Sequence, residues 1–134
     1  MPGKEIVRSD RAPQPTAGAP YSQGTAWDGS GGLVFTAGQF GIDPATGQLA
    51  PGGIEAQTRQ ALANVAAILE AGGSSLENVL KVQVLLADRG DFARMNAATP
   101  PVSESNFLSE IRPKSIRARE RELREHLPDF RVIR

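Results

Sequence analysis

The side chains that most often carry enzyme chemistry are scarce in this chain of 134 residues. It contains no cysteine, so a thiolate nucleophile, a disulfide and a cysteine-bound metal are excluded. Its single histidine, His126, lies among charged residues, and a solvated helix position is the favoured interpretation. A histidine-rich metal site is therefore impossible, and a Ser-His-acid triad would have to recruit His126.

The glycine-rich run from Gly29 to Gly32 superficially suggests phosphate binding. It lacks both the Lys-Ser/Thr pair of a phosphate loop and the spaced glycines of a dinucleotide fold, so a turn is the better interpretation. The sequence implies no nucleotide cofactor. We therefore expect neither a cofactor nor a metal.

The elements that would position any site form an α+β pattern. Strands are predicted at Glu5–Arg8, Tyr21–Trp27 and Leu33–Ala37, and an Asp-Gly turn joins the last two into a hairpin. Apolar residues recur at three- and four-residue spacing over Ile54–Ala71, which predicts a helix. The pair Gly72-Gly73 is a natural end for that helix.

Further local patterns complete this part of the chain. Residues 38–47 predict an exposed turn, and residues 74–77 resemble a capping box. Val79–Leu86 alternates apolar and polar residues, which predicts a strand, and Asp88 is suited to cap a second helix that runs through Asn96. With one more pair of strands, this order makes a two-layer sandwich with the helices on one sheet face.

The pattern changes abruptly after Ala97. All 14 glycines lie at or before Gly90, and no alternating strand of any length follows Ala97. Residues 98–134 mix 8 Lys/Arg with 6 Asp/Glu, and within them residues 116–127 predict a charged helix with a thin apolar stripe. We therefore divide the chain into a domain, residues 1–97, and a divergent charged tail, residues 98–134.

Net charge and hydropathy restrict the partners. The formal net charge is zero, so no overall field attracts nucleic acid or an anionic membrane. No apolar stretch is long enough to span a bilayer, and residues 1–10 lack the apolar core of a secretory signal. Because the absence of cysteine fits a reducing compartment, we expect a soluble cytoplasmic protein with no membrane or nucleic-acid partner.

Four short segments stand in an informative order and spacing. They are Pro20-Tyr21-Ser22-Gln23-Gly24, Phe35-Thr36-Ala37-Gly38-Gln39, Gln57-Thr58-Arg59-Gln60-Ala61-Leu62-Ala63-Asn64-Val65 and Asp91-Phe92-Ala93-Arg94-Met95-Asn96. Each is weak alone, but together, over about residues 12–97, they closely resemble the reactive-intermediate deaminase family, the RidA or YjgF-type proteins.

The resemblance implies a chorismate-mutase-like α+β fold, with helices on one face of a mixed sheet, that assembles as a homotrimer with a small-ligand pocket at each subunit interface. It also implies hydrolysis of enamines and imines, such as 2-iminopropanoate and 2-iminobutanoate, to 2-oxo acids and ammonia without cofactor or metal. This chemistry requires a cation for the substrate carboxylate, hydrogen bonds that orient the imine, and a group that activates water.

Three residues take site roles from the resemblance. Tyr21 would be catalytic and offer its hydroxyl to ligand or water, although a core tyrosine with a satisfied hydroxyl is the alternative. Gly38 would let the backbone approach the ligand and donate its N–H, against a plain turn glycine. Asn96 would face the pocket from the second helix, against a helix-terminal asparagine that bonds its own backbone.

The tail departs from the family pattern. The family continues with a Pro-Ala-Arg strand whose arginine binds the substrate carboxylate and a last strand whose glutamate handles water, and neither is visible here. Arg112 is the nearest candidate for the arginine, yet its neighbours do not match, while Glu120 and Glu122 resemble surface charges. Losing the carboxylate-binding cation costs about 2–3 kcal/mol, or roughly 30- to 150-fold in affinity.

Three explanations for the tail stay open: a natural divergent end, a change of reading frame, or a fold that pattern analysis misses. We favour the second, which predicts that another frame of the coding sequence restores a Pro-Ala-Arg strand. Two alternatives to imine hydrolysis also stay open. One is a non-catalytic member that binds small carboxylates or a protein partner, and the other is RNA binding or cleavage, against which the alternating charges of residues 119–122 argue.

Overall fold

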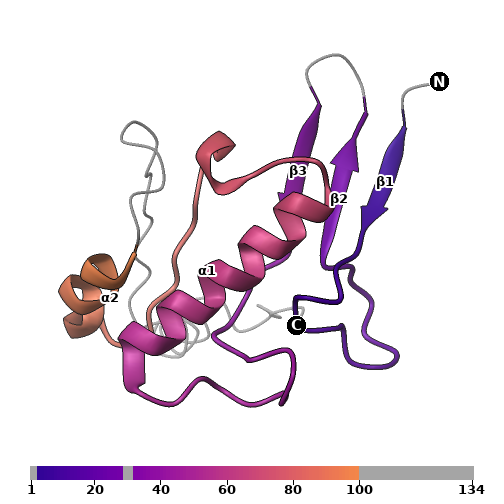
Figure 1. Ribbon diagram of the computed structural model, residues 1–134. Coiled ribbons are helices and arrows are strands. Elements are labelled where there is room, and N and C mark those ends of the chain that lie inside the picture. Colours follow the sequence, from indigo (N-terminus) through magenta and orange to yellow (C-terminus); the bar gives the residue numbers. More distant parts are fainter. Residues whose placement is uncertain (1–2, 29–31, 100–134) are drawn as a thin grey trace, which may run out of the picture.

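A computed structural model describes residues 3–28 and 32–99 of the chain. Three strands come first, followed by a long helix, two short 3-10 helices and a second α-helix (Figure 1). Their bounds are β1 Lys4–Val7, β2 Gly24–Trp27, β3 Leu33–Thr36, α1 Gly53–Ala71, η1 Leu76–Asn78, η2 Arg89–Asp91 and α2 Phe92–Ala98. The predicted α+β class is confirmed, although the strands of this part of the chain are all antiparallel.

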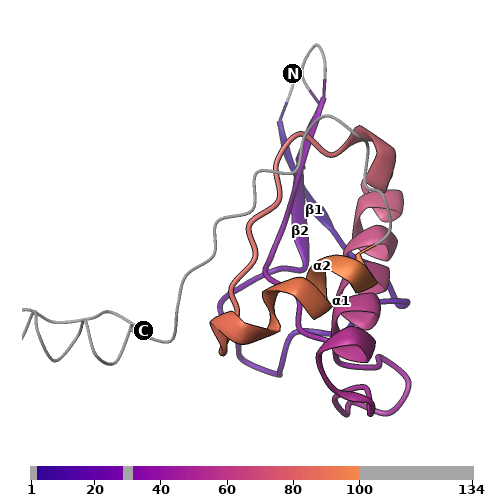
Figure 2. The same ribbon diagram turned by 90° about the vertical axis from the view of Figure 1, so that its left-hand side faces the viewer.

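The sheet has the order β1-β2-β3, and α1 covers one of its faces (Figures 1 and 2). In the register, Glu5 lies opposite Ala26, and Ala26 lies opposite Val34. The predicted first strand and hairpin are confirmed. The ladder of β2 begins at Gly24, three residues later than predicted, and the side chain of Gln23 just before it accepts a hydrogen bond from the N–H of Ser9 in the loop after β1.

The core lies between this sheet and α1. Val7, Ala12, Ala67 and Ile68 form a buried cluster. A Cβ at Gly24 would stand 2.9 Å from Cγ2 of Ile68 and 3.0 Å from the carbonyl oxygen of Phe35. The missing side chain at Gly24 is therefore what lets helix and sheet approach so closely.

The predicted helix is confirmed by α1, and so is its glycine stop. Gly73 has a φ of +79°, which favours glycine, its N–H donates to the carbonyl of Glu70 at 3.0 Å, and the N–H of Ser74 donates to that of Leu69 at 2.8 Å. These two bonds form a Schellman motif, which satisfies the last carbonyls of the helix.

Two local predictions are wrong. Among the described residues, Val79–Leu86 is not part of a ladder, and Leu85 alone forms an isolated β-bridge. Its side chains still alternate, with Val82 and Val84 half-buried and Lys81 exposed. Alternation indicates that one side of the segment is buried, and such burial does not require pairing with a neighbouring strand. The predicted capping box at residues 74–77 is also absent, because Ser75 is the N-cap of η1 and makes no side-chain capping bond.

The second helix is confirmed. Asp88 accepts a hydrogen bond from the N–H of Gly90 at 2.8 Å at the start of η2, and α2 follows through Ala98. The helix predicted over residues 116–127 lies outside the described residues. In the part of the chain that is described, no helix has both the length and the apolar character needed to cross a membrane.

Candidate functional site

Two of the three predicted site residues lie at one end of the hairpin. The N–H of Ala37 donates to the carbonyl oxygen of Gln23 at 2.8 Å, which continues the pairing of β2 and β3 by one step. Tyr21 precedes this bond by two residues and Gly38 follows it by one, so the two segments that carry them leave the sheet side by side.

Tyr21 is not a core residue. Its side chain is 52% exposed, and its hydroxyl makes no hydrogen bond within residues 3–28 and 32–99. A tyrosine buried for stability would pair its hydroxyl. The exposure of Tyr21 therefore leaves its hydroxyl available to a ligand or a water.

Gly38 is not explained by packing among the described residues. It is exposed, it is not among the glycines with positive φ, and a Cβ built on it would meet no described atom within 4 Å. Gly41 shows the contrast, since its Cβ would stand 2.5 Å from the backbone of Gln57. Gly38 also does not adopt the positive-φ backbone conformation for which a turn most often requires glycine.

The motif around Tyr21 also contains a buried amide that sequence analysis missed. The Oε1 of Gln23 accepts from the N–H of Ser9 at 2.7 Å, and its Nε2 donates to carbonyl oxygens of Ser9, Ala12 and Pro13 at 3.0–3.1 Å. Gln23 is 1% exposed. It holds the loop after β1 against the hairpin, so it organises the segment on which Tyr21 lies.

A second buried amide was missed on α1. Asn64 is fully buried, and its side chain bonds to the backbone of residues 40–42, just after Gly38. The available signal was its place four residues before Ile68, on the face that α1 turns to the sheet.

Asn96, the third predicted residue, lies exposed on α2. No bond from its side chain to its own backbone occurs in the described part of the chain, although its carbonyl oxygen accepts from the N–H of Thr99 at 3.2 Å. No described hydrogen bond joins Asn96 to Tyr21 or to Gly38. One subunit therefore brings Tyr21 and Gly38 to the same end of the hairpin and leaves Asn96 on a separate helix.

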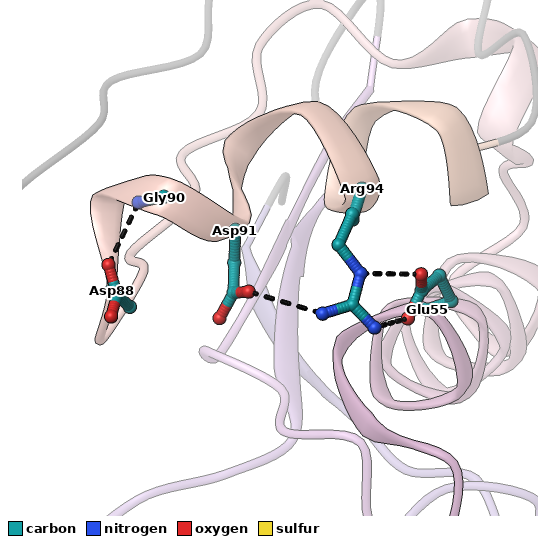
Figure 3. A network of polar contacts seen from close by, with 5 residues as sticks. All are labelled: Glu55, Asp88, Gly90, Asp91 and Arg94. Carbon is teal, nitrogen blue, oxygen red and sulfur yellow. Dashed lines mark hydrogen bonds and ion pairs between the residues drawn. The ribbon is translucent and has the colours of Figure 1, made fainter.

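An ion-pair network fixes α2 against the start of α1 (Figure 3). Arg94 donates from Nε to Oε1 of Glu55 at 2.7 Å and from Nη2 to Oε2 at 2.8 Å, and it lies 3.7 Å from Asp91. The hydrogen bond from Arg94 lowers the pKa of the Glu55 carboxyl below its usual 4.5, and the same bond raises the pKa of Arg94. This bidentate ion pair links the start of α1 to the helix that carries Asn96.

An open apolar depression of about 520 Å³ lies between α1 and α2. Leu62, Ala66 and Leu76 contribute to its lining, and Arg59 is the charged residue there. None of the three predicted site residues lines it.

Among the described residues, no group of three or more His, Asp or Glu side chains could hold a metal. Arg112, Glu120, Glu122 and His126 lie outside the described residues.

The sheet face opposite α1 is apolar and exposed. Ile6 and Phe35 flank Thr25 in one cross-strand row, and Trp27 pairs with Leu33 in the next. The four large side chains are 46–63% exposed. Exposed apolar patches of this kind are typical of interaction or ligand-binding surfaces.

Comparisons with known proteins agree on one family. A family model described as Endoribonuclease L-PSP matches residues 11–118, and so continues past Ala97 and includes Arg112. A RutC family protein of Pyrococcus horikoshii is 50% identical over 93 residues, 69% of this chain and 70% of that protein. The 2-iminobutanoate/2-iminopropanoate deaminase of Bos taurus is 43% identical over 104 residues, 78% of this chain and 72% of that protein.

Solved structures give the same result. The crystal structure of E. coli TdcF with bound serine has a TM-score of 0.68 and 31% identity, and the match covers 81% of this chain and 85% of that one. RidA from an Antarctic Psychrobacter has a TM-score of 0.66 and 33% identity, with 81% and 84% covered.

Proposed function

Because the chain belongs to the Endoribonuclease L-PSP family, the family of the RidA and YjgF proteins, we propose that it hydrolyses small 2-imino acids to 2-oxo acids and ammonia. Relatives named as 2-iminobutanoate/2-iminopropanoate deaminases support this substrate class. The observation that carries the proposal is that Tyr21 and Gly38 lie together and that neither is explained by the packing of the described subunit.

The proposed reaction needs one water for each imine. Water adds to the imine carbon, so a C–O bond forms while the C=N π pair becomes the lone pair of an amine nitrogen. Proton transfers convert this carbinolamine into a form with a protonated nitrogen, and cleavage of the C–N bond releases ammonia and leaves the 2-oxo acid. In the proposal, the Tyr21 hydroxyl orients or exchanges a proton with the water, and the Gly38 N–H hydrogen-bonds the substrate.

We further propose that the active assembly is a homotrimer in the cytoplasm. The apolar sheet face, defined by Ile6, Trp27, Leu33 and Phe35, supports association through the sheet. In such an assembly, Asn96 on α2 of one copy would complete the site with Tyr21 and Gly38 of another. The site then lies between subunits and is complete only in the assembly.

We expect the activity to be reduced relative to family members that keep the carboxylate-binding arginine. In the proposal, residues 98–134 are a divergent tail that does not present this arginine in the family's Pro-Ala-Arg context. Loss of one charge-assisted contact lowers affinity for the substrate by roughly 30- to 150-fold. Because the family's water-handling glutamate is also not found in the tail, we expect the defect in kcat as well as in KM.

The test is a coupled assay on the full chain. 2-Iminopropanoate is generated freshly by a pyridoxal-phosphate-dependent dehydratase, and formation of the 2-oxo acid is compared with the rate in buffer alone. The proposal predicts a rate above buffer that rises in proportion to protein concentration. A rate equal to that of buffer at every protein concentration would contradict it.

A second candidate is non-catalytic binding of small carboxylates. The TdcF structure with bound serine favours it, since a relative holds a small amino acid. Calorimetry with a stable 2-oxo acid or an amino acid separates the two functions. If the protein binds such a ligand but hydrolyses the imine no faster than buffer does, the function is non-catalytic binding.

RNA cleavage, which the family description names, is not favoured by charge. The described residues carry 7 Lys/Arg against 9 Asp/Glu, so no excess positive charge attracts phosphate there. RNA binding that weakens steeply as salt is raised would reverse this assignment, because release of counterions from phosphate contacts produces that dependence.

A further inference from the structure

The backbone segment that carries Gly38 is fastened to α1 immediately downstream by one buried side chain. Nδ2 of Asn64 donates to the carbonyl oxygen of Phe40 at 3.1 Å and to that of Ile42 at 2.8 Å. Its Oδ1 accepts from Nε2 of Gln60 at 2.9 Å. Both donor hydrogens and the acceptor oxygen of this amide are therefore used, and a fully paired buried amide holds its partners in one arrangement.

The residue between the two bonded carbonyls is pressed against the same helix. A Cβ on Gly41 would stand 2.5 Å from Cα and from the carbonyl oxygen of Gln57. On its other side, the carbonyl oxygen of Gly41 accepts from the N–H of Ala50 at 2.7 Å. Residues 40–42 are therefore held by α1 on one side and, on the other, by Ala50 in the segment that leads into α1.

The upstream end of the segment is held by the sheet. The N–H of Ala37 donates to Gln23 at 2.8 Å. Gly38 and Gln39 therefore form a bridge of only two residues between a point fixed on the sheet and a point fixed on α1. A two-residue connection between fixed ends has few backbone conformations, so the position of Gly38 depends on both anchors.

We propose that Asn64 is a positioning residue of the imine-hydrolysing site, which acts by fixing Phe40 and Ile42 and so setting where the Gly38 peptide group lies. This inference rests on the proposed function, in which that peptide group contacts the substrate. Displacement of a substrate-contacting group by about 1 Å costs on the order of 100-fold in rate. A buried residue that never touches substrate can therefore control catalysis.

The test uses variants that differ in what they remove. Asn64→Asp keeps the size and the acceptor for Gln60 but replaces the donor to both carbonyls with an oxygen. Gln60→Leu is milder, because it removes only the bond that orients the amide. Ile68→Val is the matched control, since Ile68 lies one turn further along the same buried face and packs on Gly24.

We expect Asn64→Asp to lower kcat/KM by about 10- to 100-fold, and Gln60→Leu by less, at a temperature where melting curves show all variants folded. Ile68→Val should stay within about twofold of the wild type. If Asn64→Asp does not fold, Gln60→Leu is compared with Ile68→Val in its place. Kinetic losses no larger than those of Ile68→Val would overturn the inference, because only stability would then have changed.

Hydrogen exchange gives a readout that does not depend on activity. In Asn64→Asp and Gln60→Leu, the amides of Asp43 and Ala50, which donate to Gln48 and Gly41 where this segment is held, should exchange faster while those of β1 and β2 keep their rates. Unchanged exchange at Asp43 and Ala50 overturns the inference, whatever the kinetics. A wild-type protein without imine hydrolysis contradicts the proposed function instead, and the exchange comparison then decides on its own whether Asn64 holds this segment.

Discussion

At the scale of single residues, the motif side chains divide by what they touch. Gln23 and Asn64 are buried amides that bind backbone, and Gly24 and Gly41 are glycines that a Cβ would force away from a neighbour. Tyr21 is exposed, and a Cβ on Gly38 would meet no described atom within 4 Å. The buried amides and the tightly packed glycines are explained by folding, so Tyr21 and Gly38 are the residues to test for a role in chemistry.

Tyr21→Phe should lower kcat/KM on 2-iminopropanoate by at least about tenfold, because loss of a proton-exchanging group costs about 10²- to 10⁴-fold where it acts alone. The melting temperature should not change, since the hydroxyl makes no hydrogen bond among the described residues. Parallel kinetics and calorimetry check both parts. A lower melting temperature with unchanged kinetics would assign Tyr21 to stability.

Two glycine variants separate packing from function. Gly41→Ala should destabilise the fold by roughly 1–3 kcal/mol, because the new Cβ meets the α1 backbone at 2.5 Å. Gly38→Ala should leave the free energy of unfolding almost unchanged and lower the imine-hydrolysis rate. Denaturant titration of both variants tests this, and equal destabilisation would show that Gly38 is also a packing glycine.

At the scale of elements, a bidentate ion pair between Glu55 and Arg94 joins α1 to α2. Because the folded-state pKa of Glu55 is lowered, the pair contributes stability above pH 4.5, and that contribution is lost as the pH falls through the folded-state pKa. The side chains are partly exposed, so the contribution is small.

The expected result is a slightly lower melting temperature for Glu55→Gln than for the wild type at about pH 7, with the two curves converging toward about pH 3. Glu77→Gln is the control, an exposed glutamate with no ion pair among the described residues. If the melting temperature of Glu55→Gln stays below that of the wild type by the same amount at low pH, the ion pair with Arg94 is not the cause of the difference.

Elements with their own local signal could be predicted from sequence, and those that depend on a distant partner could not. The Asp28-Gly29 signal predicts a hairpin, and β2 and β3 on either side of it are paired. The Gly72-Gly73 stop ends α1 through local backbone geometry. Val79–Leu86 alternates as a strand does, but pairing depends on a neighbour that the segment itself does not specify. Gln23 and Asn64 were missed because burial of an amide depends on which carbonyls the fold brings to it.

At the scale of the whole molecule, the apolar sheet face determines the assembly we propose. Phe35→Asp places a charge on that face, and it should shift the protein toward monomer and lower its specific activity. Leu80→Asp, at a similarly exposed apolar residue away from the sheet, is the matched control. Sedimentation velocity of both variants checks this, and an unchanged assembly in Phe35→Asp would move the interface elsewhere.

The claim on which the account depends is that copies of the chain together complete the site. Its most direct test is sedimentation equilibrium of the full-length protein across a dilution series, with the imine-hydrolysis rate measured on the same samples. We predict a species of three times the chain mass whose specific activity falls as dilution dissociates it. A monomer that keeps its full specific activity at every concentration would contradict the account.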